Sequence, residues 1–140
     1  MTGKTFAFAT IAGAITSFIV GYLIYGVLMA DFFANNAGSA TGVMMEEPMM
    51  VGLVLGNVVY AAFLTLVLGS WAKVSSVGAG VKAGTLVGLL VGLSMNLIWY
   101  STSNLATLTA HMVDAALSGV LAGITGAVIA VVVGKTYAAT

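Results

Sequence analysis

Four apolar stretches constrain this chain more than any other feature of its sequence. They cover residues of about 5–30, 48–70, 80–100 and 105–134. A helix of roughly 20 residues crosses the hydrocarbon core of a bilayer, and each stretch reaches that length. Spanning backbone must be a helix or a strand of a closed barrel, and barrel strands are about 10 residues long with alternating polarity. These stretches are longer and apolar on every side, so the sequence predicts an all-α membrane protein.

Composition supports lipid as the solvent of this chain. Hydrophobic residues make up 61% of it and charged residues only 6%, whereas a soluble domain is about a quarter charged. The chain lacks Cys and Arg and has a net charge of about zero, which argues against disulfides, thiolate chemistry and nucleic-acid binding. The first stretch is longer than a signal-peptide core of roughly 7–15 residues. No convincing cleavage site precedes Asp31, so we expect this stretch to remain as the first helix.

The lysines set the expected topology. With four spans, all lysines fall on one side of the membrane, at Lys4, Lys73, Lys82 and Lys135. The acidic Asp31, Glu46 and Glu47 fall on the other side, in an outer loop of about 31–47. Cytoplasmic segments are enriched in lysine. The sequence therefore predicts one domain, residues 1–140, folded as an up-down bundle of four transmembrane helices with both termini cytoplasmic. The outer loop reads either as an ordinary connector or as a gate or partner-docking surface.

Small residues recur at every fourth position in three of the stretches. Residues four apart share a helix face, and small faces let helix backbones approach closely in lipid. The rows include Gly13, Ser17 and Gly21 in the first stretch, Gly84, Gly88 and Gly92 in the third, and Gly119 and Gly123 in the fourth. The fourth stretch has a second row, from Ser118 to Gly134. A single bundle could use both faces, or one face could meet another subunit, and we expect a homo-oligomer.

Ionisable and amide side chains within the stretches are the candidate functional residues. His111 and Asp114 are three apart and share a helix face, near the outer edge of the hydrocarbon. Ionisable groups inside a membrane are costly, so this pair could relay protons or bind a cation. Alternatively, both groups lie at the outer interface, bonded to each other, to water or to the loop. Asn57 and Asn96 read either as interhelical hydrogen-bonding groups or as the lining of a solute path.

Enzyme signatures are missing from the sequence. It has no phosphate-binding glycine loop with Lys, no His-Glu metal-binding helix, and no Ser-His-Asp set with a second His to choose from. Two ligands alone, His111 and Asp114, are a weak metal signal. We therefore expect no enzymatic activity, no catalytic residues, no metal site and no cofactor.

Short motifs along nearly the whole chain carry a family resemblance. They are Gly21-Tyr22-Leu23-Ile24-Tyr25, Gly56-Asn57, Lys82-Ala83-Gly84, the turn from Tyr100 to Asn104, and Asp114. In these motifs the chain resembles a family of small four-helix bacterial membrane proteins that is described only as a domain of unknown function. The resemblance implies a multi-pass protein of the bacterial inner membrane, with no established activity and no catalytic residues to carry over.

Two functional hypotheses from different classes remain open. The first is a structural or assembly role, in which the chain self-associates or serves as a small subunit of a larger membrane complex. The second is a channel or transporter for ions or small solutes, lined by His111, Asp114, Asn57 and Asn96. A conducting role requires these polar residues to converge on one wetted cavity, whereas a packing role lets them bond neighbouring helices in a dry core.

Overall fold

The computed structural model describes residues 1–137, and its regular elements in that range are helices. They are α1 (Gly3–Gly21) continued by the π-helical segment η1 (Tyr22–Leu28), α2 (Ala30–Asn35), α3 (Met50–Leu64) continued by the π-helical segment η2 (Thr65–Trp71), α4 (Val77–Thr102) and α5 (Leu108–Tyr137). Four helical stretches are long and apolar enough to cross a membrane: Gly3–Leu28, Met50–Trp71, Val77–Thr102 and Leu108–Lys135. The predicted all-α, multi-pass membrane protein is confirmed at this level.

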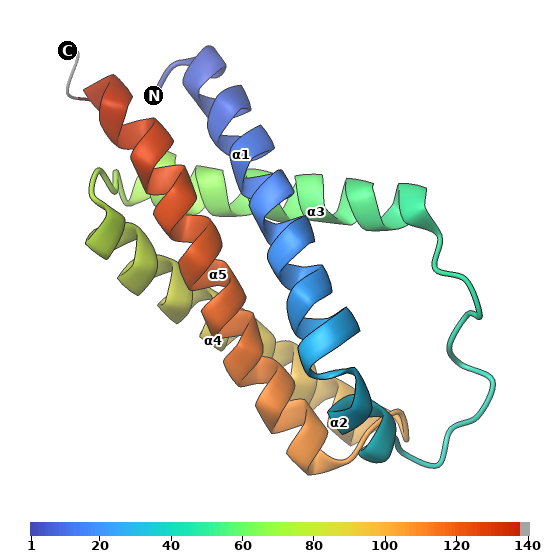
Figure 1. Cartoon of the computed structure of the whole chain (residues 1–140). Coiled ribbons are helices and arrows are strands. Elements are labelled where there is room, and N and C mark those ends of the chain that lie inside the picture. Colours follow the sequence, from blue (N-terminus) through green and yellow to red (C-terminus); the bar gives the residue numbers. More distant parts are fainter. Residues whose placement is uncertain (138–140) are drawn as a thin grey trace.

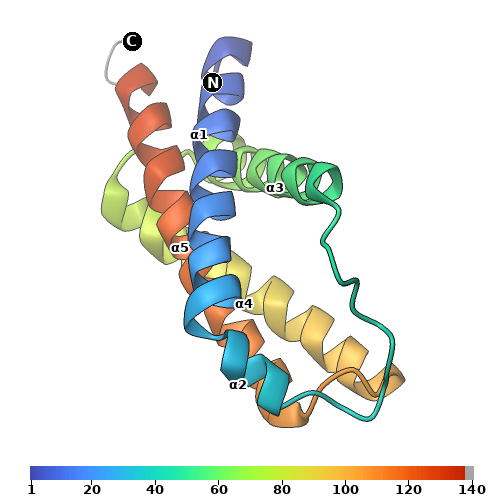
Figure 2. The same cartoon turned by 45° about the vertical axis from the view of Figure 1, so that its right-hand side comes forward.

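The four long helices pack as a bundle in which one member lies across the others. Figure 1 shows α4 and α5 running side by side in opposite directions, with α1 next to α5 and both termini at the same end. The helix α3 crosses α1 steeply, and its first residues lean away from α4 in both views (Figures 1 and 2). Its main contacts are with α1, whereas α4 makes its main contacts with α5.

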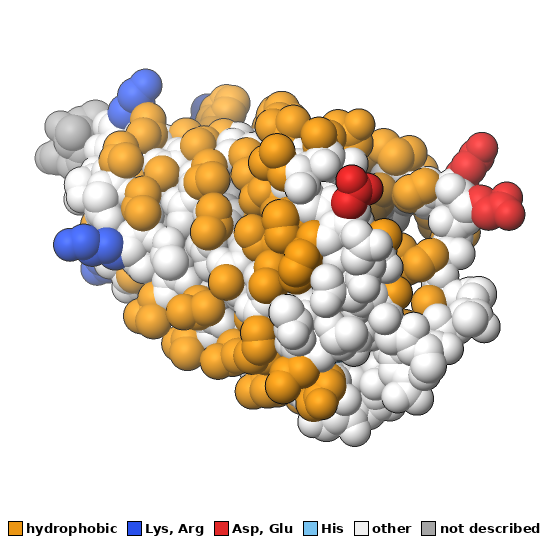
Figure 3. Space-filling view, turned by 60° about the horizontal axis from the view of Figure 1, so that its bottom comes forward, with side chains coloured by type: hydrophobic (Ala, Val, Ile, Leu, Met, Phe, Trp, Pro, Cys, Tyr) orange, Lys and Arg blue, Asp and Glu red, His pale blue; other side chains and the backbone are white. Residues whose placement is uncertain are grey.

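Charged side chains gather at the two ends of the bundle. Figure 3 shows the lysines at one end and carboxylates toward the other, with hydrophobic side chains over the surface between them. All four lysines are exposed, as are Asp31, Glu46 and Glu47. An apolar belt between two charged ends is the surface expected of a membrane-spanning bundle.

The contact between α4 and α5 depends on glycine. The buried residues of α4 are Gly80, Gly84, Gly88, Gly92 and Asn96, which form one face of the helix. A Cβ atom built on Gly92 would lie 2.6 Å from the Cβ of Ser118, and one on Gly80 would lie 2.6 Å from the Cβ of Ala130. Both separations are far below van der Waals contact. The two backbones therefore touch, which gains dispersion contacts that larger side chains would prevent.

Both small-residue rows of α5 face the rest of the same chain. The row that begins at Ser118 meets the glycines of α4. The second row also turns toward α4, because Cβ positions at Gly119 and Gly123 lie 3.3 Å from Leu89 and 3.5 Å from Thr85 Cβ atoms. Gly119 and Gly123 are buried. Within the described residues, neither row of α5 is left free for a second subunit.

The small residues of α1 are used unequally. A Cβ atom on Gly13 would lie 3.2 Å from Ile129 and 3.3 Å from Ala61, so this glycine sits where α1, α3 and α5 meet. Ser17 is 1% exposed. At Gly21 the nearest atom to a Cβ would be a Leu121 methyl at 3.9 Å, which is ordinary contact.

The first half of α3 has few neighbours. Its buried residues are Ala61 and Leu64, near its end, and burial continues in η2. A Cβ atom on Gly56 would meet nothing within 4 Å, and one on Gly52 would meet only the side chain of Met49. The helix is therefore held by its second half and by η2.

Two connections join at the end of the molecule opposite the termini. Ala37 and Ala106 form an isolated antiparallel bridge, and the Gly38 amide donates to the Leu105 carbonyl at 2.9 Å. A Cβ atom on Gly38 would overlap the Asn104 carbonyl group, so only glycine fits there. The expected loop 31–47 is thus partly structured, because it starts inside α2 and then pairs with the α4–α5 turn.

Candidate functional site

The four residues predicted to line a pathway occupy two separate places. His111, Asn96 and Asp114 come together where α4 and α5 approach their shared turn. Asn57 lies elsewhere, on α3, where it faces α1. Three of the four residues expected to line a pathway therefore converge, and the fourth belongs to a different helix contact.

Asn96 is the centre of the three-residue cluster. It continues the glycine face of α4, so its side chain enters the α4–α5 contact. Its Nδ2 group donates to the Gly92 carbonyl at 2.9 Å and to Asp114 Oδ2 at 2.7 Å. Its Oδ1 atom lies 2.7 Å from His111 Nδ1. Both donors and the acceptor of the amide are thus engaged, which fixes its orientation.

His111 is held by this amide and is 7% exposed. Because Asn96 presents an oxygen to it, the His111 Nδ1 atom carries a proton and donates. Its Nε2 atom is buried and has no hydrogen-bond partner in the part of the chain that the structure describes. The imidazole ring also lies edge-on to Tyr100, with centroids 6.0 Å apart.

Asp114 is the one carboxylate inside the spans, and its neighbours are neutral donors. It accepts from Asn96 at 2.7 Å, and the side chains of Tyr25 and Ser118 lie nearby. The lysines nearest along the helices are Lys82, 14 residues before Asn96, and Lys135, 21 residues after Asp114. At 1.5 Å per residue these separations are about 21 Å and about 31 Å.

The cluster is not a direct proton relay between His111 and Asp114. The Asn96 amide lies between them and bonds each one through a different atom. An amide N–H group does not release its proton as an acid does. The Asn96 amide therefore holds the two ionisable groups close together, but it does not pass a proton from one to the other.

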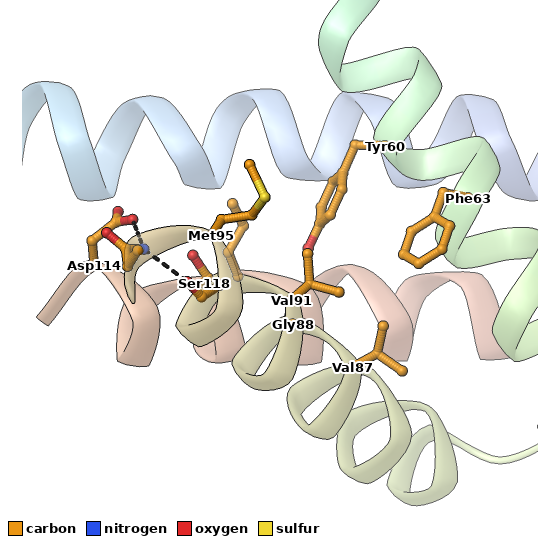
Figure 4. A pocket seen from close by; sticks show the side chains of 11 residues that line it. Tyr60, Phe63, Val87, Gly88, Val91, Met95, Asp114 and Ser118 are labelled. Atoms are coloured by element: carbon orange, nitrogen blue, oxygen red, sulfur yellow. Dashed lines mark hydrogen bonds between the residues drawn. The ribbon is translucent and has the colours of Figure 1, made fainter. Parts of the chain in front are cut away.

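A cavity of about 300 Å³ opens next to the cluster. Asn96, Asp114 and Ser118 line one part of it, and Tyr60 together with apolar residues of α3, α4 and α5 lines the remainder. Figure 4 shows Tyr60 and Phe63 reaching from α3 toward α4, with Asp114 and Ser118 at the other end of the row. The cavity exists because α3 diverges from α4, so the space between them is not filled by the chain.

Asn57 faces a second cavity, of about 310 Å³, between α1 and α3. Its amide accepts from the Ser17 hydroxyl at 2.7 Å and donates to the Leu53 carbonyl at 2.9 Å. The other lining side chains are apolar, among them Phe18 and Ile15. Asn57 thus joins two helices by a hydrogen bond, which matches the packing interpretation of an amide in lipid.

Tyr25 and Ser118 lie beside the cluster, although neither was predicted to do so from the sequence. Tyr25 lies near the end of the first span and reads as an interfacial aromatic residue. Ser118 reads as one member of a small-residue row. Their positions along the spans could have indicated this. Tyr25, Asn96 and Asp114 all lie within two helical turns of a span end on the same side of the membrane.

Comparisons with known proteins add no family to this description. No protein-family model matches the chain. No curated protein matches it at a significant level, and no solved structure does so either. In the described residues, no group of three or more His, Cys, Asp or Glu side chains could hold a metal ion. The findings identify a small multi-pass membrane protein without assigning it to the family that its motifs resemble.

Proposed function

We propose that this chain is a non-catalytic membrane protein that binds a small cationic solute at Asp114 and passes it through the membrane. The observation that carries the proposal is a carboxylate inside the spans that opens onto a cavity and has only neutral donors around it. A carboxylate within a bilayer is costly unless it is neutralised or paired. A bound cation supplies the missing charge.

The orientation of the protein is part of this proposal. The lysines gather at one end of the molecule (Figure 3), and the termini, close in sequence to Lys4 and Lys135, lie together at one end in Figure 1. Lysine enrichment marks the cytoplasmic side. With both termini in the cytoplasm, the Asp114 cluster lies in the outer half of the membrane. The family resemblance favours the inner membrane of a bacterium as the location.

The proposed pathway is narrower than the one the sequence predicts. It uses Asp114 as the charged group, with Asn96 and His111 holding its position. Asn57 is outside it, because its hydrogen bonds join α1 and α3 at the other cavity. A solute at Asp114 would reach the α3–α4 cavity without passing Asn57.

Flux measurements in proteoliposomes test the proposal. We expect wild-type protein to carry radiolabelled methylammonium or sodium ions down a gradient, and Asp114→Asn to reduce this flux at least tenfold, because the amide keeps the shape and removes the charge. Asp31→Asn is the matched control: it makes the same chemical change on an exposed residue outside the spans, so its flux should equal that of wild type.

Two results would count against passage of a cation. One is wild-type flux no higher than that of empty liposomes for both ions. The other is equal flux from wild type and Asp114→Asn when both variants have the same assembly and thermal stability.

Self-association is a second candidate role, and the exposed glycines of α3 favour it. Gly52 and Gly56 are four apart on a helix that packs loosely in its own chain. Such a pair lets another helix approach closely in lipid, and we propose a second copy of this chain as the occupant. The mass of the particle extracted in native lipid tests this role: a fixed multiple of the chain mass supports it, and a monomer contradicts it.

A further inference from the structure

We infer that the cavity between α3 and α4 takes an organic ammonium ion with an apolar body, which enters sideways from the lipid. This inference rests on the proposed function and names the class of its solute. It combines the chemistry of the cavity walls with the divergence of α3 from α4.

The cavity has a polar part and an apolar part. The carboxylate of Asp114 and the hydroxyl of Ser118 lie together at one end. The aromatic rings of Tyr60 and Phe63 stand on the α3 side, toward α4 (Figure 4). An ammonium group matches the carboxylate by charge, and the aromatic rings at the other end can pack against the apolar body of the same molecule.

The oxygen atoms available are too few for a hard metal ion. Calcium takes 6–8 oxygen ligands and magnesium requires near-octahedral geometry. In this cavity the Asn96 oxygen already accepts from His111, and the Asn96 nitrogen already donates to Asp114. The carboxylate of Asp114 and the hydroxyls of Ser118 and Tyr60 remain, which is at most four oxygen atoms. An organic ammonium ion needs only such a carboxylate, because apolar and aromatic contacts supply the rest of its binding.

The size of the cavity agrees with a small organic molecule. Its volume of about 300 Å³ lies at the lower end of the range of about 300–1,000 Å³ for small-molecule sites. A single dehydrated metal ion would leave most of this space empty. A molecule with one aromatic ring and a trimethylammonium head would occupy the polar end and part of the apolar end.

The mouth of the cavity faces the bilayer. Phe63, Val91 and Met95 line it and are 40%, 44% and 49% exposed. They belong to the middle and outer parts of membrane-length helices, so their exposed surface meets lipid. A solute with an apolar body concentrates in lipid by the hydrophobic effect and would reach this mouth without entering from water.

The second cavity, between α1 and α3, provides a contrast within the same molecule. It has nearly the same volume, and Asn57 is its polar residue. It holds no carboxylate to pair with a cation. A cationic ligand should therefore bind more tightly in the Asp114 cavity than in the second cavity, while a neutral apolar molecule should show no such preference.

Binding of benzyltrimethylammonium to the full chain in lipid nanodiscs tests the inference. We expect saturable binding above that of empty nanodiscs, weakened roughly 30-fold or more by Asp114→Asn, as for removal of one partner of a buried charge pair. Phe63→Leu should weaken binding by about 2- to 13-fold through loss of the contact between its ring and the aromatic ring of the probe. Phe18→Leu, which makes the same change in the other cavity, should leave binding unchanged.

Competition with wild-type protein keeps the test decisive if a variant fails to fold. Neopentylbenzene has the shape of the probe without its charge, and excess neopentylbenzene should not displace the probe. Displacement by neopentylbenzene, or equal displacement by sodium chloride at the probe concentration, would overturn the inference. Sodium flux that depends on Asp114 without any probe binding would also overturn it, yet would leave the proposed function standing. Absence of both binding and flux would remove both.

Discussion

The contact between α4 and α5 and the space between α3 and α4 lie on adjacent sides of the same helix. On one side, glycines bring two backbones together without a gap. On the other, the larger Tyr60 and Phe63 stand between diverging helices and leave a cavity of about 300 Å³. Gly88 and Gly92 take part in both, because they touch α5 and also line the cavity.

The difference shows what determines helix packing when lipid is the solvent. Lipid tails are as apolar as leucine, so apolar side chains alone give helices little reason to associate. The side of α4 with small residues is closed, and the side with valine and methionine remains open although both sides are apolar. Shape therefore decides which faces close, and hydropathy does not.

Gly88→Leu should have the largest effect on this comparison. A Cβ atom at Gly88 would lie 3.1 Å from the Ser118 carbonyl carbon and would overlap the Ala122 side chain. We expect a loss of about 1–3 kcal/mol of unfolding free energy, or failure to fold, because a close-packed contact must separate. An SDS-unfolding titration in mild detergent measures it. Gly78→Leu is the control on the same helix, since its Cβ meets nothing within 4 Å.

Asn96→Leu should have an intermediate effect, larger than that of Asn57→Leu. Replacing Asn96 removes the hydrogen bonds to Gly92, Asp114 and His111, and we expect a cost of about 1–2 kcal/mol. Replacing Asn57 removes one bond between helices and one within its own helix. The same unfolding titration compares the two variants. A larger loss of unfolding free energy for Asn57→Leu would show that the Asn96 cluster does not stabilise the fold more than the Asn57 hydrogen bonds do.

Gly56→Leu should have the smallest effect on the fold. Nothing in the described chain lies within 4 Å of a Cβ at this position, so unfolding free energy should change by no more than about 0.5 kcal/mol. If two copies associate through α3, the same variant should shift the particle in native lipid toward the monomer mass. A loss of stability as large as that of Gly88→Leu would contradict the loose packing of α3.

Sequence reasoning identified the four spans because length and hydropathy are local properties of the chain. The glycine row of α4 was also visible, since residues four apart share a face in any helix. The sequence did not indicate which row of α5 packs against that face. Both rows consist of small residues, and the rotation of the two helices about their axes determines which row makes the contact. The steep crossing of α3 could not be predicted either, since the hydropathy of a span does not determine the angle at which it crosses another helix.

The candidate site was partly visible in the sequence. The spacing of His111 and Asp114 places them on one helix face, but the amide between them comes from another helix. Asn96 lies six residues before the end of α4, and Asp114 six residues after the start of α5. Because these two positions are equally far from the turn of one helical hairpin, a contact between Asn96 and Asp114 could have been predicted. Asn57 could not be separated from this group, because its partner Ser17 depends on where α3 crosses α1.

The bridge between Ala37 and Ala106 has a mechanical consequence. It ties the end of the first span to the α4–α5 turn, so three of the four long helices are joined at that end. From residue 39 to residue 49 the chain reaches α3, and 11 extended residues cover roughly 36–40 Å. At the other end, α3 connects to α4 by only the five residues 72–76. The long connection leaves the tilt of α3 open, and the tilt of a spanning helix responds to bilayer thickness. We therefore expect the width of the α3–α4 cavity to change with the thickness of the membrane.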